Sequence, residues 1–229
     1  MIEIRVDNLF DVEGAFVLST NTTFDTDMSA GLISKMSLQG QFTTNYYNKV
    51  EHLNRDLEES LKGEVPISED TIGNTKRHKI GGKTKCYEIG TVAQVCPSDE
   101  VVVYLVAIAH INDNGKAYGT VEEVIKGLGK LWYYIGEHGE LESIVVPVLG
   151  TGLTRIRISR EDMIREIIKS FITACSEKKF TDKLTIVISE SDYRKYKIDL
   201  DELGKYLYHH CKYTVLKSKT DTGRGEEIP

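Results

Sequence analysis

The chain has 229 residues, of which 40% are hydrophobic, enough for one well-filled domain, and no linker divides it in two. Its 29 basic and 35 acidic residues give a net charge of -6, without any run of lysine or arginine. This balance argues against the basic patch that nucleic-acid binders carry, so we expect no nucleic-acid partner.

The cysteine pattern and the N-terminus favour a reducing, cytoplasmic location. The four cysteines show neither CxxC spacing nor a histidine at zinc-finger distance, and the opening MIEIRVD is unlike a secretory leader. The longest strongly apolar stretch, residues 101–109, is about half as long as a membrane-spanning helix. We therefore expect a soluble domain, and any membrane anchor of the parent protein would lie outside this chain.

Short runs rich in β-branched residues predict the strands. They lie at residues 2–6, 14–20, 86–95, 101–109, 143–149 and 183–189. The last three runs are apolar on both faces, which is typical of strands in the middle of a covered, largely parallel sheet.

Apolar residues at helical spacing predict helices between these strands. Residues 28–62 are interpreted as two helices, and residues 121–135 and 164–175 each carry a core-facing stripe. Ser159 with Asp162 forms a plausible cap for the helix over 164–175, and a last helix is expected from about Asp199.

The alternation of strand and helix predicts an α/β domain with helices on both faces of the sheet. We expect a single domain over residues 1–216, a loop or hairpin insertion at 63–85, and a flexible C-terminal tail at 217–229. Ligands in such sheets usually bind at the carboxyl ends of the strands, so the polar residues there are the candidates for a site.

The most informative of these strand ends is the segment VVPVLGTGL at residues 145–153. Leu149 leads into the loop Gly150-Thr151-Gly152, followed by Leu153, Thr154 and Arg155. Glycines after a strand allow backbone amides to approach a phosphate without a Cβ in the way. The segment lacks the lysine of a Walker loop and is not GxGxxG, and a simple turn remains the alternative.

A second strand ends in the polar cluster Asn21-Thr22-Thr23. The Asn21 amide can donate to and accept from a pair of sugar hydroxyls, or it can close an Asx turn. Asp25 can steady the same loop or contact the sugar, although a surface carboxylate is the default reading.

Polar or aromatic groups follow two further strands. Asp7-Asn8-Leu9 offers oxygens that could accept from the exocyclic amine of adenine, or forms an ordinary polar turn. Tyr193, beyond the last strand, is a candidate for stacking on a base.

The order of these elements resembles the macro domain, an ADP-ribose-binding module. The matching pieces are residues 7–9, VLSTN at 17–21 and PVLGTGL at 147–153. More closely, NTTFDT at 21–26, SLQGQF at 37–42, YEIGTV at 87–92 and VPVLGTGLTR at 146–155 look like the divergent macro domain of the Thoeris anti-phage system. The resemblance covers most of residues 1–216.

The resemblance implies a three-layer α/β/α sandwich with a mixed, largely parallel central sheet. It also implies a ligand, ADP-ribose or a conjugate such as histidine-ADP-ribose, that a TIR-type enzyme makes from NAD, and no other cofactor. In that family the macro domain is carried on a membrane-anchored effector and senses the signal. Binding would then activate the effector, with a homo-oligomer as one possible active form.

The resemblance also assigns the parts of the ligand. The amides of residues 150–154 would hold the diphosphate with help from Arg155, the adenosine would lie toward Asp7, Asn8 and Tyr193, and the distal ribose toward Asn21. A substituent on that ribose would meet the segment from Phe24 to Gln39.

Two departures from the pattern of macro domains that hydrolyse ADP-ribose esters bear on catalysis. Leu18 stands where the first of two asparagines is expected, and TDMSAG at 26–31 replaces a glycine series. We therefore expect a sensor without catalytic residues and without a metal site. The alternatives are an ADP-ribosyl hydrolase that uses Asn21 to orient a water, and an assembly module whose glycine loop is only structural.

Overall fold

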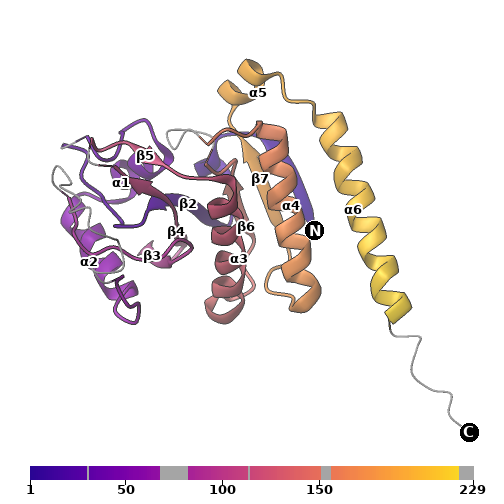
Figure 1. The fold of residues 1–229 in the computed structure, drawn as a ribbon, viewed down its shortest axis with the longest axis horizontal. Helices are drawn as coiled ribbons and strands as arrows, with labels where there is room; N and C mark the ends of the chain where they lie inside the picture. Colours follow the sequence, from indigo (N-terminus) through magenta and orange to yellow (C-terminus); the bar gives the residue numbers. More distant parts are fainter. Residues whose placement is uncertain (30, 68–81, 113, 151–155, 222–229) are drawn as a thin grey trace, which may run out of the picture.

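A mixed seven-stranded sheet forms the middle layer of the molecule (Figure 1). The computed structural model describes residues 1–29, 31–67, 82–112, 114–150 and 156–221, with side chains as far as residue 212. The strands run in the order β1-β7-β6-β2-β4-β3, with β5 paired to β4. They are β1 (Ile2–Val6), β2 (Ala15–Asn21), β3 (Val92–Ser98), β4 (Val101–Ile111), β5 (Ala117–Tyr118), β6 (Ile144–Pro147) and β7 (Leu184–Ile188).

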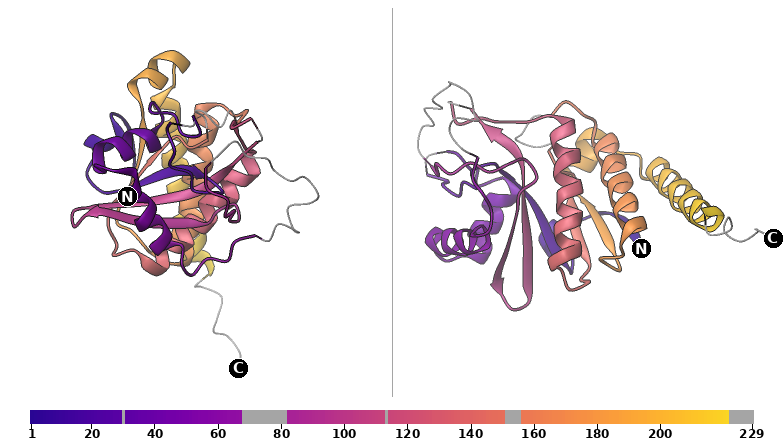
Figure 2. Two further views of the ribbon diagram at one scale, coloured as in Figure 1. Left: turned by 90° about the vertical axis from the view of Figure 1, so that its left-hand side faces the viewer. Right: turned by 60° about the horizontal axis from the view of Figure 1, so that its bottom comes forward.

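Helices cover both faces of this sheet (Figure 2). They are η1 (Leu9–Asp11), α1 (Leu38–Tyr46), α2 (Val50–Ser60), α3 (Val121–His138), α4 (Arg160–Glu177), α5 (Glu190–Tyr196) and α6 (Leu200–Asp221). The first five strands in the sheet order are mutually parallel, whereas β3 and β5 run antiparallel to β4. The predicted α/β three-layer sandwich with a largely parallel sheet is confirmed.

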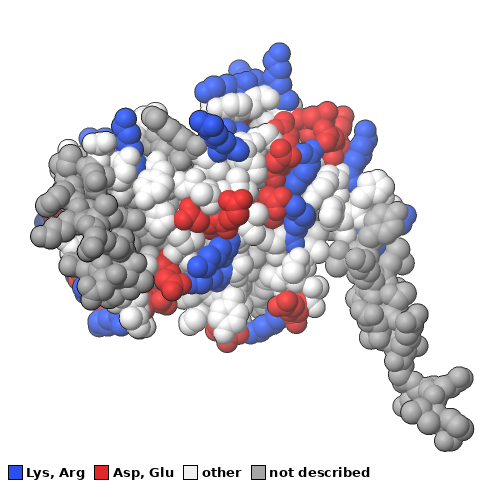
Figure 3. Space-filling view, viewed as in Figure 1, with Lys and Arg blue, Asp and Glu red and all other residues white. Residues whose placement is uncertain are grey.

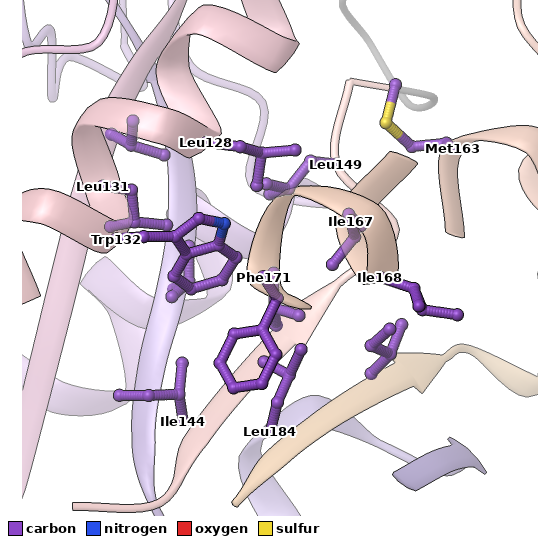
Figure 4. Packing of buried hydrophobic residues seen from close by; sticks show 14 of the residues in the cluster. Leu128, Leu131, Trp132, Ile144, Leu149, Met163, Ile167, Ile168, Phe171 and Leu184 are labelled. Atoms are coloured by element: carbon purple, nitrogen blue, oxygen red, sulfur yellow. The ribbon is translucent and has the colours of Figure 1, made fainter. Parts of the chain in front are cut away.

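The larger core cluster lies between the sheet and α3, α4 and α6. Trp132 is its centre: the ring is 1% exposed, meets Phe171 edge-on at 5.4 Å and donates from Nε1 to Ser170 Oγ at 3.0 Å. Figure 4 shows side chains of α3, α4, β6 and β7 packed around the Trp132 ring. The periodic stripes over 121–135 and 164–175 supply these residues, as expected.

The second core cluster fills the opposite face, under η1, α1 and α2. Phe42, Leu53 and Leu57 are fully buried in it, which explains the apolar stripe of the second helix. The predicted pair of helices over 28–62 begins ten residues late, at Leu38, because Ser37 caps it: Ser37 Oγ accepts from the Gly40 amide at 3.1 Å.

The strand expected at 86–95 begins at Val92 instead. Residues 86–91 are bonded elsewhere, since the Tyr87 amide donates to Thr22 O at 2.8 Å. Gly90 then turns the chain with φ +89, and its amide donates to Ala107 O at 2.7 Å. A left-handed residue interrupts a strand ladder, which a run of β-prone letters does not reveal.

The C-terminal part differs from the expected boundary at 216, because α6 continues to Asp221. The helix packs against α4 and β1 at the edge of the sheet (Figure 1). The insertion expected at 63–85 lies largely outside the described residues.

Charges are intermixed on the face that carries α3 and α4 (Figure 3). Lys130 of α3 pairs there with Glu88, in the segment before β3, at 2.8 Å, and Arg165 pairs with Asp162 one turn away within α4 at 2.7 Å. Among the described helices, none has the length and apolar content needed to cross a bilayer.

Candidate functional site

The carboxyl ends of the five parallel strands lie at one edge of the sheet. In sheet order these ends are Val6, Ile188, Pro147, Asn21 and Ile111. Residues that directly follow them are therefore brought side by side, although they come from distant parts of the sequence.

Two adjoining cavities open along this edge, of about 450 and 500 Å³. They share six lining residues and so form one elongated crevice: Leu38, Gln41, Pro147, Val187, Ser189 and Ser191. The first cavity lies at the end of β1 and the second at the ends of β2, β4 and β6. Volumes of this size are ordinary for small-molecule sites.

The first cavity is lined by Asp7, Asn8 and Leu9, the predicted contact turn. The Asp7 carboxylate pairs with Arg5 Nε at 2.7 Å and accepts from the Asn8 amide at 2.8 Å. Asn8 caps η1, and its Nδ2 donates to Asp11 at 3.1 Å. The turn is thus held by its own hydrogen bonds and still presents polar atoms to the cavity.

Asn21 lines the second cavity, and its Oδ1 closes the Asx turn that was the alternative interpretation. Oδ1 accepts from the Thr23 amide at 3.0 Å and from the Asp25 amide at 3.4 Å. Thr23 Oγ1 lies 2.7 Å from Oδ1, but its single proton is donated to Asp25 Oδ2 at 2.6 Å. Among the described residues none accepts from Asn21 Nδ2. Two backbone donors fix the oxygen, so the amide offers its N–H₂ group as the donor to anything in the cavity.

Asp25 supports this loop from below, and its default reading as a surface carboxylate is wrong. The residue is fully buried, accepts from Thr23 Oγ1 at 2.6 Å and from the Lys83 amide at 2.8 Å. Its carbonyl accepts from Gln39 Nε2 at 2.7 Å. Gln39, one of the predicted ligand contacts, lines the second cavity, and its Oε1 has no donor among the described residues.

Phe24 does not line the crevice, contrary to the prediction. It is fully buried in the second core cluster, where its ring meets Tyr87 edge-on at 5.7 Å. A phenyl ring gains more free energy in an apolar core than beside polar loop atoms, which explains the difference. Its φ of +49 turns the chain so that Asp25 follows inward.

Leu149 and Gly150 line the second cavity, so the described start of the glycine loop lies beside Asn21. Leu149 is 1% exposed and packs in the larger core cluster, which holds the end of the strand in place. Gly150 has φ +70, and an added Cβ would lie 2.7 Å from Ile156 Cδ1. The Ile156 amide donates back to Gly150 O at 3.4 Å, which closes the base of the loop. The other predicted contacts in it, Thr151, Gly152, Leu153, Thr154 and Arg155, lie outside the described residues.

Tyr193 is not brought to the crevice. It lies in α5, its ring is partly buried against the larger core, and its amide donates to Ser189 O at 2.9 Å. The neighbouring Ser189, Ser191 and Asp192 line the crevice instead. A helix after β7 sends every third or fourth residue toward the core, and Tyr193 occupies such a position.

Sequence reasoning missed several lining residues. The segment before α1 forms a wall of the second cavity, with Leu32 and Ile33 buried and Met36 84% exposed at the rim.

Strand residues line the same cavity. Ser19 and Thr20 lie just before Asn21 in β2, and Ile111 of β4 and Ala117 of β5 close the cavity on the other side of the sheet order. The polar letters within an otherwise apolar strand were the available signal for Ser19 and Thr20.

Comparisons with known proteins agree with this architecture. The family described as "Thoeris protein ThsA, Macro domain" matches residues 2–189. Thoeris protein ThsA of Bacillus amyloliquefaciens (strain Y2) is 24% identical over 200 residues, which cover 85% of this chain and 64% of that protein. The chain thus spans less than two thirds of this relative.

Solved structures share the fold at low sequence identity. The Oceanobacillus iheyensis macrodomain with ADP superimposes with a TM-score of 0.57 at 13% identity, over 91% of this chain and 92% of that chain. The Trypanosoma brucei macrodomain in complex with ADP-ribose gives 0.55 at 12% identity, over 86% and 67%. The family match spans most of the chain and the fold agrees with it, so the chain belongs to the family of Thoeris ThsA macro domains.

Proposed function

We propose that this domain is a sensor that binds an NAD-derived ADP-ribose conjugate, histidine-ADP-ribose, in bacterial anti-phage defence. The observation that carries the proposal is that Asn21 and Gly150 line the second cavity, which adjoins the first cavity at Asp7 and Asn8. A ligand with a nucleoside, a diphosphate and a second sugar is elongated in the same way as this crevice.

The ligand is assigned to the crevice from one end to the other. The adenosine lies at Asp7-Asn8-Leu9 and the distal ribose at the Asn21 amide. The diphosphate between them is held by backbone amides of residues 150–154 and by Arg155, rather than by a cluster of lysines. Amide N–H groups suit a phosphate in a protein of net charge -6, because they bind the anion without adding cationic side chains.

The substituent on the distal ribose is assigned to the wall formed by residues 32–36 together with β4 and β5. Leu32, Ile33 and Ile111 make this end of the cavity largely apolar. Plain ADP-ribose would leave that surface in contact with water, whereas a conjugate carrying a ring would cover it. Burial of this apolar surface favours the conjugate.

The hydrogen bonds at the end of β2 support binding without turnover. A side chain that activates a nucleophilic water as a general base must accept a proton from it. Asn21 Oδ1 already accepts from two backbone amides, and Leu18, which stands where hydrolysing macro domains carry an asparagine, is fully buried in the second core cluster. Neither side chain offers a free acceptor, which supports a binding role for the domain.

A sensor must bind its ligand more tightly in one state than in another. We propose that the signal comes from a TIR-type enzyme, that the domain belongs to a membrane-anchored effector, and that the liganded form activates the effector, with self-association as the candidate for the active state. Size-exclusion chromatography with light scattering, with and without ligand, tests the last of these points.

Isothermal titration with histidine-ADP-ribose, ADP-ribose and ADP tests the binding proposal. We expect the conjugate to bind at least about 10-fold more tightly than ADP-ribose, the gain expected from burying part of a side chain's apolar surface. Equal affinities for ADP-ribose and the conjugate would contradict the proposed selectivity. If none of the three ligands binds, the proposed sensor function is wrong.

A release assay on ADP-ribosylated protein and on the conjugate tests the hydrolase alternative. We expect no turnover above the uncatalysed rate. Turnover by the wild-type protein that disappears in Asn21→Ala would show that the domain is a hydrolase rather than a sensor.

A further inference from the structure

We propose that Thr20 is an additional ligand-contacting residue, whose hydroxyl completes a hydrogen-bonding set with Asn21 and Gln39 that recognises the hydroxyl groups of the distal sugar. This inference rests on the proposed function, since it concerns the same crevice. It adds a residue that the strand-end pattern does not indicate.

The starting observation is an unpaired buried hydroxyl in the wall of the second cavity. Thr20 is 4% exposed and lines this cavity, yet its Oγ1 has no hydrogen-bond partner among the described residues and is shielded from solvent. Buried hydroxyls are nearly always paired, because an unmade hydrogen bond costs free energy. A valine of the same shape would avoid this cost.

The strand neighbours of Thr20 explain why no protein group fills this role. Thr20 lies beside Ala107 in the register with β4, and Leu18, two residues before it on the same face, is apolar. The hydroxyl therefore faces no polar side chain along or across the sheet. Thr20 is the last residue of β2 before the register shift at Asn21, where the strand opens to the cavity.

The groups beside it are already oriented by the protein. Asn21 Oδ1 and Gln39 Nε2 are held by the loop, which leaves Asn21 Nδ2 as a fixed donor and Gln39 Oε1 as a fixed acceptor. A ribose hydroxyl both donates and accepts, so a pair of hydroxyls needs partners of both kinds. One fixed donor, one fixed acceptor and one rotatable hydroxyl meet this requirement.

The Thr20 hydroxyl can reach a ligand by a change of rotamer. Rotation about χ1 between staggered positions exchanges Oγ1 with the methyl group, and threonine in a strand adopts more than one of them. In the free protein Oγ1 is turned inward. A sugar in the cavity supplies the missing partner, and the rotamer that points toward it is then favoured.

The test compares Thr20→Val, which removes only the hydroxyl, with Thr20→Ser, which keeps it. Each protein is titrated with ADP-ribose, its histidine conjugate and ADP, which lacks the distal ribose. We expect Thr20→Val to bind ADP-ribose and the conjugate about 5- to 10-fold more weakly, the usual value of one hydrogen bond, and to bind ADP as the wild type does. Thr20→Ser should stay within about 2-fold of the wild type for all three ligands.

A thermal melt without ligand separates binding from folding. Because the hydroxyl is unpaired, Thr20→Val should melt at the same temperature as the wild type or above it. Thr20→Ala, which also lacks the hydroxyl, serves as the second variant if the valine protein fails to fold.

The outcomes distinguish this inference from the proposed function. Wild-type affinity of Thr20→Val for ADP-ribose, or an equal loss for ADP, overturns the role of Thr20 and leaves the sensor intact. Absence of binding by the wild-type protein to all three ligands overturns the proposed function, and the role of Thr20 with it.

Discussion

Asn21 Oδ1 accepts a hydrogen bond from the Thr23 amide at 3.0 Å, so the residue predicted to hold a sugar also closes its own loop. The two interpretations of Asn21 considered from the sequence are therefore compatible. The oxygen builds the turn, and the nitrogen remains available to the proposed ligand.

This double role predicts that Asn21→Ala loses both stability and affinity. Removal of the amide leaves the Thr23 and Asp25 amides without their acceptor, which should cost about 1 to 2 kcal/mol of unfolding free energy. Loss of the donor to the ligand and of the loop's shape should weaken ADP-ribose binding by at least about 10-fold. Urea denaturation and calorimetric titration measure the two effects.

Asn48→Ala is the matched control, because Asn48 is exposed between α1 and α2 and outside the crevice. It should leave both quantities unchanged. If Asn21→Ala binds ADP-ribose as tightly as this control, Asn21 is only a turn residue.

The backbone conformation of Gly150, at the base of the glycine loop, leads to a second prediction. With φ +70, an alanine is strained by about 1 kcal/mol. Its Cβ would also lie 2.7 Å from Ile156 Cδ1 and 3.2 Å from Val124 Cγ2, so Ile156 must shift. Gly150→Ala should lower the unfolding free energy by about 1 to 2 kcal/mol and weaken ligand binding, because the loop it begins changes direction.

Gly129→Ala is the control in the opposite direction. Gly129 is exposed in the middle of α3, and nothing lies within 4 Å of an added Cβ. Alanine there should raise the unfolding free energy by about 0.5 to 1 kcal/mol and leave binding unchanged. If both variants shift stability in the same direction, backbone strain at position 150 is not the cause.

The sequence was sufficient to predict the layers and the edge of the sheet that carries the crevice. Apolar runs such as β4 and β7 and the helical stripe around Trp132 depend on burial, which composition and period reveal. The polar residues after β1 and β2 could be placed together because parallel strands end at one edge. These inferences require only the direction of the strands.

Side-chain direction within the site could not be predicted in the same way. Phe24 and Tyr193 follow strand ends but pack into the core, and Asp25 is buried beneath the loop. Each position depends on a single turn, such as the positive φ of Phe24, which shifts all later side chains. The register shift after Thr20 is another such local feature, and no pattern of residue types marks it.

The cap of α4 gives a prediction that depends on pH. Ser159 Oγ accepts from the Asp162 amide at 3.0 Å and donates to the Asp162 carboxylate at 2.8 Å. The hydrogen bond from Ser159, followed by that from Arg165, lowers the pKa of the Asp162 carboxyl. Ser159→Ala should cost about 1 kcal/mol of unfolding free energy at neutral pH.

The pH dependence has a definite sign. Because the folded pKa of Asp162 is lowered, its contribution to stability is present above the ordinary carboxyl pKa of about 4 and disappears as the pH falls through the lowered value. The difference between wild type and Ser159→Ala should therefore shrink in urea denaturation at acidic pH. A difference that grows on acidification contradicts the role of Asp162 in the cap.

Leu32 gives the most direct test of how the crevice selects its ligand. Its side chain is 7% exposed, lines the second cavity and lies 3.5 Å from the position of a Cβ on Gly115, near the turn between β4 and β5. Leu32→Ala removes apolar surface from the wall assigned to the ribose substituent. We expect the affinity for histidine-ADP-ribose to fall by about 10-fold and that for ADP-ribose by less than about 2-fold.

Val65→Ala is the matched control, because Val65 is an exposed apolar residue that lines neither cavity; it should change neither affinity by more than about 2-fold. Calorimetric titration of the three proteins with both ligands decides the matter: equal losses for the two ligands in Leu32→Ala would mean that the wall shapes the whole crevice and does not contact the substituent.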